Sequence, residues 1–105
     1  MKKKMTKEFY DTSMTPELMC TDYKRSLAFY VDVLGFNIQY ARPEEGFAML
    51  ERQGSRIMLD QIIQGDKRSW FSGPLEYPFG RGINLQIDTT DATELYERVK
   101  QSGHK

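Results

Sequence analysis

Residues 21–36, TDYKRSLAFYVDVLGF, decide the fold of this chain. Asp22 carries the short polar side chain that helix N-caps favour. Gly35 stands where a glycine can take the left-handed conformation and end a helix. Between them, apolar residues recur at i, i+4, i+7, i+8 and i+11, which places them in one stripe on a helix. They are Tyr23, Leu27, Tyr30, Val31 and Leu34. The pattern predicts an amphipathic helix.

Short apolar or alternating runs on both sides of this helix predict strands. Residues 16–21 form one, beginning at Pro16, since proline is tolerated at a strand start or edge. Three more follow the helix, separated by turn sequences at Pro43–Gly46 and Gln53–Ser55. They cover residues 36–40, 47–51 and 56–63. The predicted order is strand, helix and three strands, an α+β fold.

Side-chain alternation predicts which residues share a face in two of these strands. In the strand at 36–40, the residues placed on one half-buried face are Phe36, Ile38 and Tyr40. In the strand at 56–63, Ile57 and Leu59 lie on one face. The opposite face carries Met58, Asp60 and Ile62.

The first half of this order recurs further along the chain. Residues 83–88 alternate apolar and polar side chains and predict a strand, and Thr90-Asp91 repeats the cap at Thr21-Asp22. A second apolar stripe follows, and Gly103 ends its helix. It comprises Ala92, Leu95, Tyr96 and Val99. The three strands that would complete a second copy are missing, so we expect a truncated second unit.

These patterns divide the chain into four segments. We expect a flexible N-terminal extension at 1–13 and a first complete unit at 14–65. An aromatic-rich connecting loop at 66–81 precedes the start of the second unit at 82–105, a strand and helix only.

Composition excludes several classes of function. Fifteen basic and fifteen acidic residues cancel, which gives no general attraction to nucleic acid or to an anionic membrane. Nothing approaches the roughly 20 apolar residues of a membrane span. The one cysteine, Cys20, cannot form an internal disulfide and fits a reducing cytoplasm. We expect a cytoplasmic protein.

The loop at 66–81 interleaves Trp70, Phe71, Tyr77 and Phe79 with glycines and prolines. One interpretation is that these rings cover a core edge or a subunit interface. The other is that they form the lid or wall of a ligand pocket, where flat rings supply contact area.

The sequence resembles the vicinal oxygen chelate superfamily, which includes glyoxalases, dioxygenases and bleomycin resistance proteins. The segments that carry the resemblance are PELMCTD at 16–22, SLAFYVDVLGF at 26–36, FAMLERQGSRIMLDQI at 47–62 and GRGINLQID at 80–88. The resemblance implies βαβββ modules, paired within a chain or between the chains of a homodimer so that their sheets form a cup around a ligand.

The resemblance also places the metal ligands of the family's enzymes. They would fall at Thr15, Asp60 and Gly82, with the fourth in a missing strand. Only Asp60 of these could bind a metal, and a transition-metal site needs about three protein ligands. The single histidine, His104, is interpreted as an exposed terminal residue. We expect no metal, no other cofactor and no catalytic residue.

The metal-free branch resembles bleomycin resistance proteins, which are dimers that sequester a drug between subunits. That resemblance implies that Pro16 helps the N-terminal strand cross to the partner. The same resemblance implies that the Phe47 ring faces the ligand. The alternative is that Phe47 is an ordinary ring of the hydrophobic core. Strand alternation and the loop complete the predicted ligand-binding set, which is Phe47, Met58, Asp60, Trp70, Phe71, Phe79, Arg81, Asn84 and Gln86. Asn84 and Gln86 are alternatively plain solvated residues.

Three hypotheses follow for function. The first is a non-enzymatic protein that binds a small planar molecule, such as an antibiotic. The hypothesis includes ligands that carry a positive charge. The second is a metal-dependent lyase or dioxygenase of the same superfamily. The third is an inactive truncated fragment.

Overall fold

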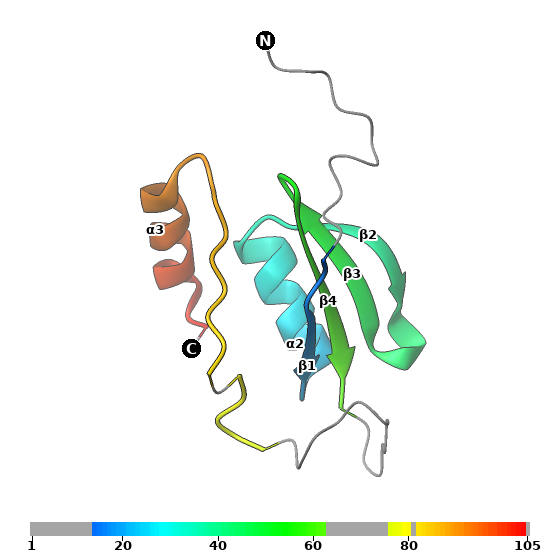
Figure 1. The fold of residues 1–105 in the computed structure, drawn as a ribbon. Coiled ribbons are helices and arrows are strands. Elements are labelled where there is room, and N and C mark those ends of the chain that lie inside the picture. Colours follow the sequence, from blue (N-terminus) through cyan, green and yellow to red (C-terminus); the bar gives the residue numbers. More distant parts are fainter. Residues whose placement is uncertain (1–13, 63–75, 81, 105) are drawn as a thin grey trace.

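The computed structural model describes residues 14–62, 76–80 and 82–104. Four strands form one mixed sheet in the order β1-β4-β3-β2 (Figure 1). Their bounds are β1 Glu17–Cys20, β2 Asn37–Arg42, β3 Phe47–Arg52 and β4 Ser55–Gln61. β1 runs parallel to β4, and the other neighbours are antiparallel. With the helix between β1 and β2, the predicted α+β order of strand, helix and three strands is confirmed.

The predicted helix forms in two parts, α2 (Tyr23–Ala28) and the π-helical η1 (Phe29–Val33). The Asp22 carboxylate accepts a hydrogen bond of 3.1 Å from the Arg25 backbone N–H, which confirms the cap. The widened last turn ends with the Leu34 N–H donating to the Phe29 carbonyl at 3.0 Å. Gly35 then takes a φ of 83°, the left-handed conformation predicted for it.

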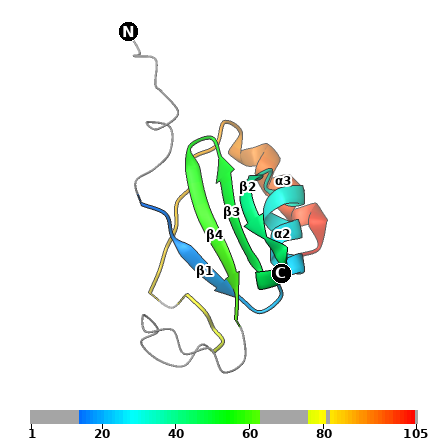
Figure 2. The ribbon, with the colours of Figure 1, turned by 90° about the vertical axis from the view of Figure 1, so that its right-hand side faces the viewer.

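The core lies between this helix and one face of the sheet, with α2 and α3 both on that side (Figures 1 and 2). Leu50 and Leu59 are 0% and 1% exposed. The other buried members of the cluster are Tyr23, Phe36, Ala48 and Ile57. The remaining helix residues of the predicted stripe, Leu27, Tyr30, Val31 and Leu34, pack against them. The predicted core faces of the helix and of β4 are therefore confirmed.

A β-bulge in β2 contradicts the face predicted for residues 36–40. The pairing with β3 shifts between Ile38 and Tyr40, since Ile38 pairs with Leu50 and Tyr40 pairs with Met49. Leu50 and Met49 are consecutive and face opposite sides, so Ile38 and Tyr40 do too. The extra residue, Gln39, causes the switch, because a bulge places two residues opposite one.

The strand predicted over 83–88 is wrong, because residues 83–89 form no strand (Figure 1). A strand requires a neighbour to hydrogen-bond with, and the alternating pattern supplies none. Ile83 and Leu85 are 64% and 47% exposed rather than packed under a helix. Ile87 does pack against the core, and the Thr89 hydroxyl accepts a 3.1 Å hydrogen bond from the Arg52 guanidinium.

The second predicted helix forms as α3 (Ala92–Ser102) and lies against η1. Asp91 caps it by accepting from the Glu94 backbone N–H at 2.9 Å, and Gly103 ends it with a φ of 80°. Of its predicted apolar stripe, Leu95 and Val99 are half-buried, while Ala92 and Tyr96 are exposed. Within residues 76–80 and 82–104, α3 is the sole regular element.

Replacing Leu50 with alanine tests the core. We expect the free energy of unfolding to fall by about 2–5 kcal/mol, because a fully buried leucine leaves a cavity. Leu85→Ala is the matched control, and its exposed side chain should cost no more than about 0.5 kcal/mol. Urea-unfolding curves measure both free energies. If the two variants lost the same free energy of unfolding, the buried position of Leu50 would be contradicted.

Candidate functional site

The face of the sheet turned away from α2, called here the open face, brings polar and apolar side chains together in two cross-strand rows. Strand register defines both rows. The first row runs Arg42, Phe47, Asp60 and Met19 from β2 to β1. The second runs Tyr40, Met49, Met58 and Glu17. Opposite residues of neighbouring strands stand about 4.5–5.5 Å apart at Cβ, so each row is continuous.

Three of the residues predicted to bind a ligand lie in these rows. Phe47 and Asp60 are direct neighbours across β3 and β4 and are 8% and 7% exposed. Met58 is half-buried in the second row. Their role in ligand binding remains a prediction, but the structure places them on one surface.

The other predicted residues do not join them. Asn84 and Gln86 are exposed in the segment that forms no strand, so strand alternation cannot turn them into the cup. Phe79 is exposed and lies near the edge of β1 rather than on the open face. Trp70, Phe71 and Arg81 lie outside the described residues.

Sequence reasoning missed Arg42 and Tyr40, which form the β2 end of the rows. The Arg42 guanidinium carbon lies 4.3 Å from the centroid of the Phe47 ring and 5.3 Å from that of Tyr40. The alternation of Tyr40 and Arg42 was visible in the sequence. The bulge that turns both onto the open face was not.

Two hydrogen bonds fix the Arg42 guanidinium. Its Nε donates to the Glu45 carboxylate at 2.6 Å, and an Nη donates to the Tyr40 hydroxyl at 3.0 Å. These bonds to Tyr40 and Glu45 raise the pKa of Arg42, which keeps it a cation at any physiological pH. This end of the site therefore carries a permanent guanidinium cation that is paired with the Glu45 carboxylate.

The turn between β2 and β3 brings Glu45 back to Arg42. Residues Pro43–Glu45 form a single 3-10 turn that ends at Gly46 with a φ of 66°. A side chain at Gly46 would start 2.7 Å from the Gln61 Cβ atom, so both the backbone conformation and the space require glycine.

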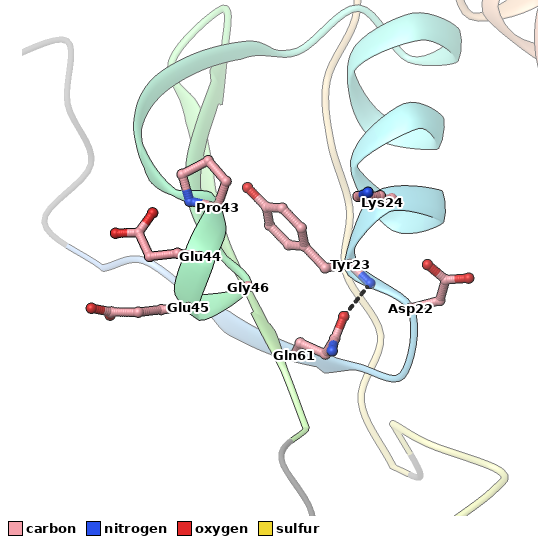
Figure 3. A pocket seen from close by; sticks show the side chains of 8 residues that line it. All are labelled: Asp22, Tyr23, Lys24, Pro43, Glu44, Glu45, Gly46 and Gln61. Carbon is pink, nitrogen blue, oxygen red and sulfur yellow. Dashed lines mark hydrogen bonds between the residues drawn. The ribbon is translucent and has the colours of Figure 1, made fainter.

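Three hollows lie beside the helices or at the β1 edge of the sheet, and the one at β1 includes Glu17 and Met19 from the ends of the two rows. One of about 390 Å³ borders β1 and is lined by Leu18, Cys20, Tyr30, Phe79 and Ile83, among others. One of about 650 Å³ lies over α2 and includes Phe29, Tyr77, Phe79 and His104. The third, of about 330 Å³, lies between the start of α2 and the Pro43–Glu45 turn, where the Tyr23 N–H donates to the Gln61 side chain at 2.8 Å (Figure 3).

The donor set does not fit the metal site of the superfamily's enzymes. In the described ranges, no three His, Cys, Asp or Glu side chains come together as a metal site requires. Asp60 has Phe47 and Met19 as its cross-strand neighbours, and neither of these is a hard-metal ligand. The helices that the structure describes also include none long and apolar enough to cross a membrane.

Comparison with known proteins shows which families the chain resembles. A model of the bleomycin resistance protein-like N-terminal region matches residues 12–52. A solved structure described as a glyoxalase/bleomycin resistance protein/dioxygenase from Nocardioides is similar, with a TM-score of 0.63 and 25% identity. That similarity covers 90% of this chain and 63% of the other. The chain is similar to proteins of the glyoxalase/bleomycin resistance/dioxygenase superfamily and has their fold.

Bleomycin resistance proteins from Geobacillus stearothermophilus and Staphylococcus aureus are each 29% identical to the chain over 96 residues. The matched region covers 84% of this chain and 69% of theirs. A superfamily member of known structure from Vibrio splendidus 12B01 is 41% identical and has a TM-score of 0.44. It is matched over 83% of this chain and 65% of its own, so the chain spans less than two thirds of that protein.

Cys20 offers a test of β1 placement because it is the one thiol in the chain. Burial raises the pKa of the Cys20 thiol, and the carboxylates of Asp60 and Asp22 add to the rise. A raised pKa leaves less thiolate at about pH 8, and the thiolate is the reactive form. We expect slower alkylation in the folded protein than in the guanidinium-unfolded chain, followed by mass spectrometry. Equal rates in both states would contradict the buried position.

Proposed function

We propose that this chain forms a non-enzymatic small-molecule-binding site, which holds a planar aromatic ligand against the open face of its sheet. The observation that supports this most is the grouping of Tyr40, Phe47, Met49 and Met58 on that face. Aromatic and methionine side chains adapt to flat ligands, and a few polar groups among them set orientation. Arg42 and Asp60 are such groups.

Relatives named bleomycin resistance proteins support capture of an antibiotic as the biological role. Capture needs affinity but no catalytic group. The metal-dependent alternative of the same superfamily lacks support from the donor set, because Asp60 alone supplies a suitable side chain at the matched positions.

Removing the rings of the open face tests this proposal. Tyr40 is 52% exposed, so Tyr40→Ala leaves the core intact, whereas Phe47→Ala removes a ring that is nearly buried. We expect each variant to bind its ligand about fivefold or more weakly, since truncation of a ring that anchors a ligand costs roughly 1 kcal/mol or more. Calorimetric titration with bleomycin and with flat aromatic probes measures this.

The matched control is Tyr96→Ala, which removes an exposed ring of the same kind from α3. Its affinity should equal that of the unchanged protein. Failure of bleomycin and of every flat probe to bind would contradict the proposal, as would turnover of a bound probe with a tightly bound metal.

We further propose that two copies of the chain assemble so that a second surface closes over the open face. One sheet alone supplies one wall, and a ligand pocket normally buries most of its ligand. Exposed apolar residues of the C-terminal segment, Ile83 and Leu85, favour such an assembly. Within the chain, the Met58 N–H donates a hydrogen bond to the Pro16 carbonyl at the start of β1. If β1 of each chain crossed to its partner, the same hydrogen bond would form between the two chains.

Sedimentation velocity tests the assembly. We expect the unchanged protein to be a dimer at micromolar concentration. The double variant with Ile83→Ser and Leu85→Ser should have a larger fraction of monomer at the same concentration. Asn84→Ser and Gln86→Ser together serve as the polar control on the same segment. A monomer that binds its ligand with full affinity would contradict the shared pocket.

A further inference from the structure

We infer that Arg42 determines ligand specificity at the open face and that the preferred ligand is a planar aromatic acid, bearing a carboxylate or a phosphate. This inference rests on the function proposed above and narrows the ligand class. It begins from the position of Arg42, stacked on the ring that a flat ligand would otherwise contact.

The guanidinium changes what Phe47 can bind. Phe47 is only 8% exposed, and Arg42 lies over its ring at 4.3 Å. A cation–π contact already uses the negative ring face. A cationic ligand would have to displace Arg42 and break its bonds to Glu45 and Tyr40, whereas an anionic ligand can add to it.

Arg42 retains the groups needed to hold an acid. It has five N–H donors in a planar fork. Its hydrogen bonds to Tyr40 and Glu45 use two of them, counted within the described residues. Its side chain is 38% exposed, so solvent and solutes reach it. The remaining donors match the two oxygens of a carboxylate or phosphate.

The same group also favours a flat ring. A guanidinium plane stacks on aromatic faces on either side. Phe47 supports the inner face of Arg42, and Tyr40 stands beside it. A ligand ring on the outer face would extend this stack over Met49, which is next to Tyr40 in the second row. Ring and acid group are thereby recognised at adjacent positions.

The Glu45 carboxylate offsets part of this charge but leaves most of the N–H donors of Arg42 to a ligand. Glu45 binds Nε and leaves the Nη edge of Arg42, apart from its bond to Tyr40, to a ligand. Asp60 lies beyond Phe47 in the first row and is 7% exposed. Arg42 is therefore the more accessible charge of the two.

A matched pair of probes tests the inference. Naphthoate and naphthylmethylammonium share one ring system and differ in the sign of charge. By calorimetric titration, we expect the unchanged protein to bind naphthoate about tenfold or more tightly than the cation, as expected for a charge-assisted hydrogen bond. Arg42→Gln should abolish that preference, and Arg42→Lys should retain part of it, because lysine keeps the charge but not the planar stack.

Arg25→Gln is the matched control, since it makes the same charge change on α2, away from the open face, and it should leave naphthoate affinity unchanged. Urea-unfolding curves of each variant check that the fold is retained. Equal binding of both probes, a naphthoate preference that survives in Arg42→Gln, or a loss caused by Arg25→Gln would each overturn the inference. The binding function would still stand in those cases, whereas failure of both probes and of bleomycin to bind overturns both.

Discussion

The packing of the α2–η1 helix on one face of the sheet is the constraint on which the rest of the structure depends. Leu50 and Leu59 are almost fully buried beneath it, and Tyr23 joins the two layers through a 3.2 Å hydrogen bond from its hydroxyl to the Phe47 carbonyl. Because side chains alternate along strands, burial of one set sends the neighbouring set to the other face. The open face is thus a direct consequence of the core.

Among the positions that the superfamily's metal ligands would occupy, Asp60 alone carries a metal-binding side chain. The two rows of the open face combine rings and methionines with Arg42 at one end and Asp60 in the middle. A single carboxylate among apolar neighbours cannot assemble a coordination sphere. The function proposed above uses this arrangement for a flat organic ligand, for which ring contact would supply affinity and a few charges would supply orientation.

The C-terminal segment shows how a local pattern depends on its surroundings. Residues 83–88 have the alternation of a strand, yet they form no ladder, and Ile83 and Leu85 remain exposed. α3 forms nonetheless, since a helix satisfies its hydrogen bonds internally and its caps, Asp91 and Gly103, are adjacent in sequence. Helical structure here needs only the segment itself, whereas strand structure needs a partner.

The sequence by itself determined the first helix with its caps, the order of elements along the chain in the first module and the division of β4 between Ile57 with Leu59 and Met58 with Asp60. These features follow from spacing within one element, which is local information. Met58 and Asp60 could be placed on the open face for the same reason, whereas the prediction for Phe47 came from the family resemblance. Only the tertiary structure decided the rest of the site. The bulge at Gln39 moved Tyr40 and Arg42 onto the open face, and cross-strand pairing stacked Arg42 on Phe47. Register between strands depends on contacts between segments, which no single periodicity records.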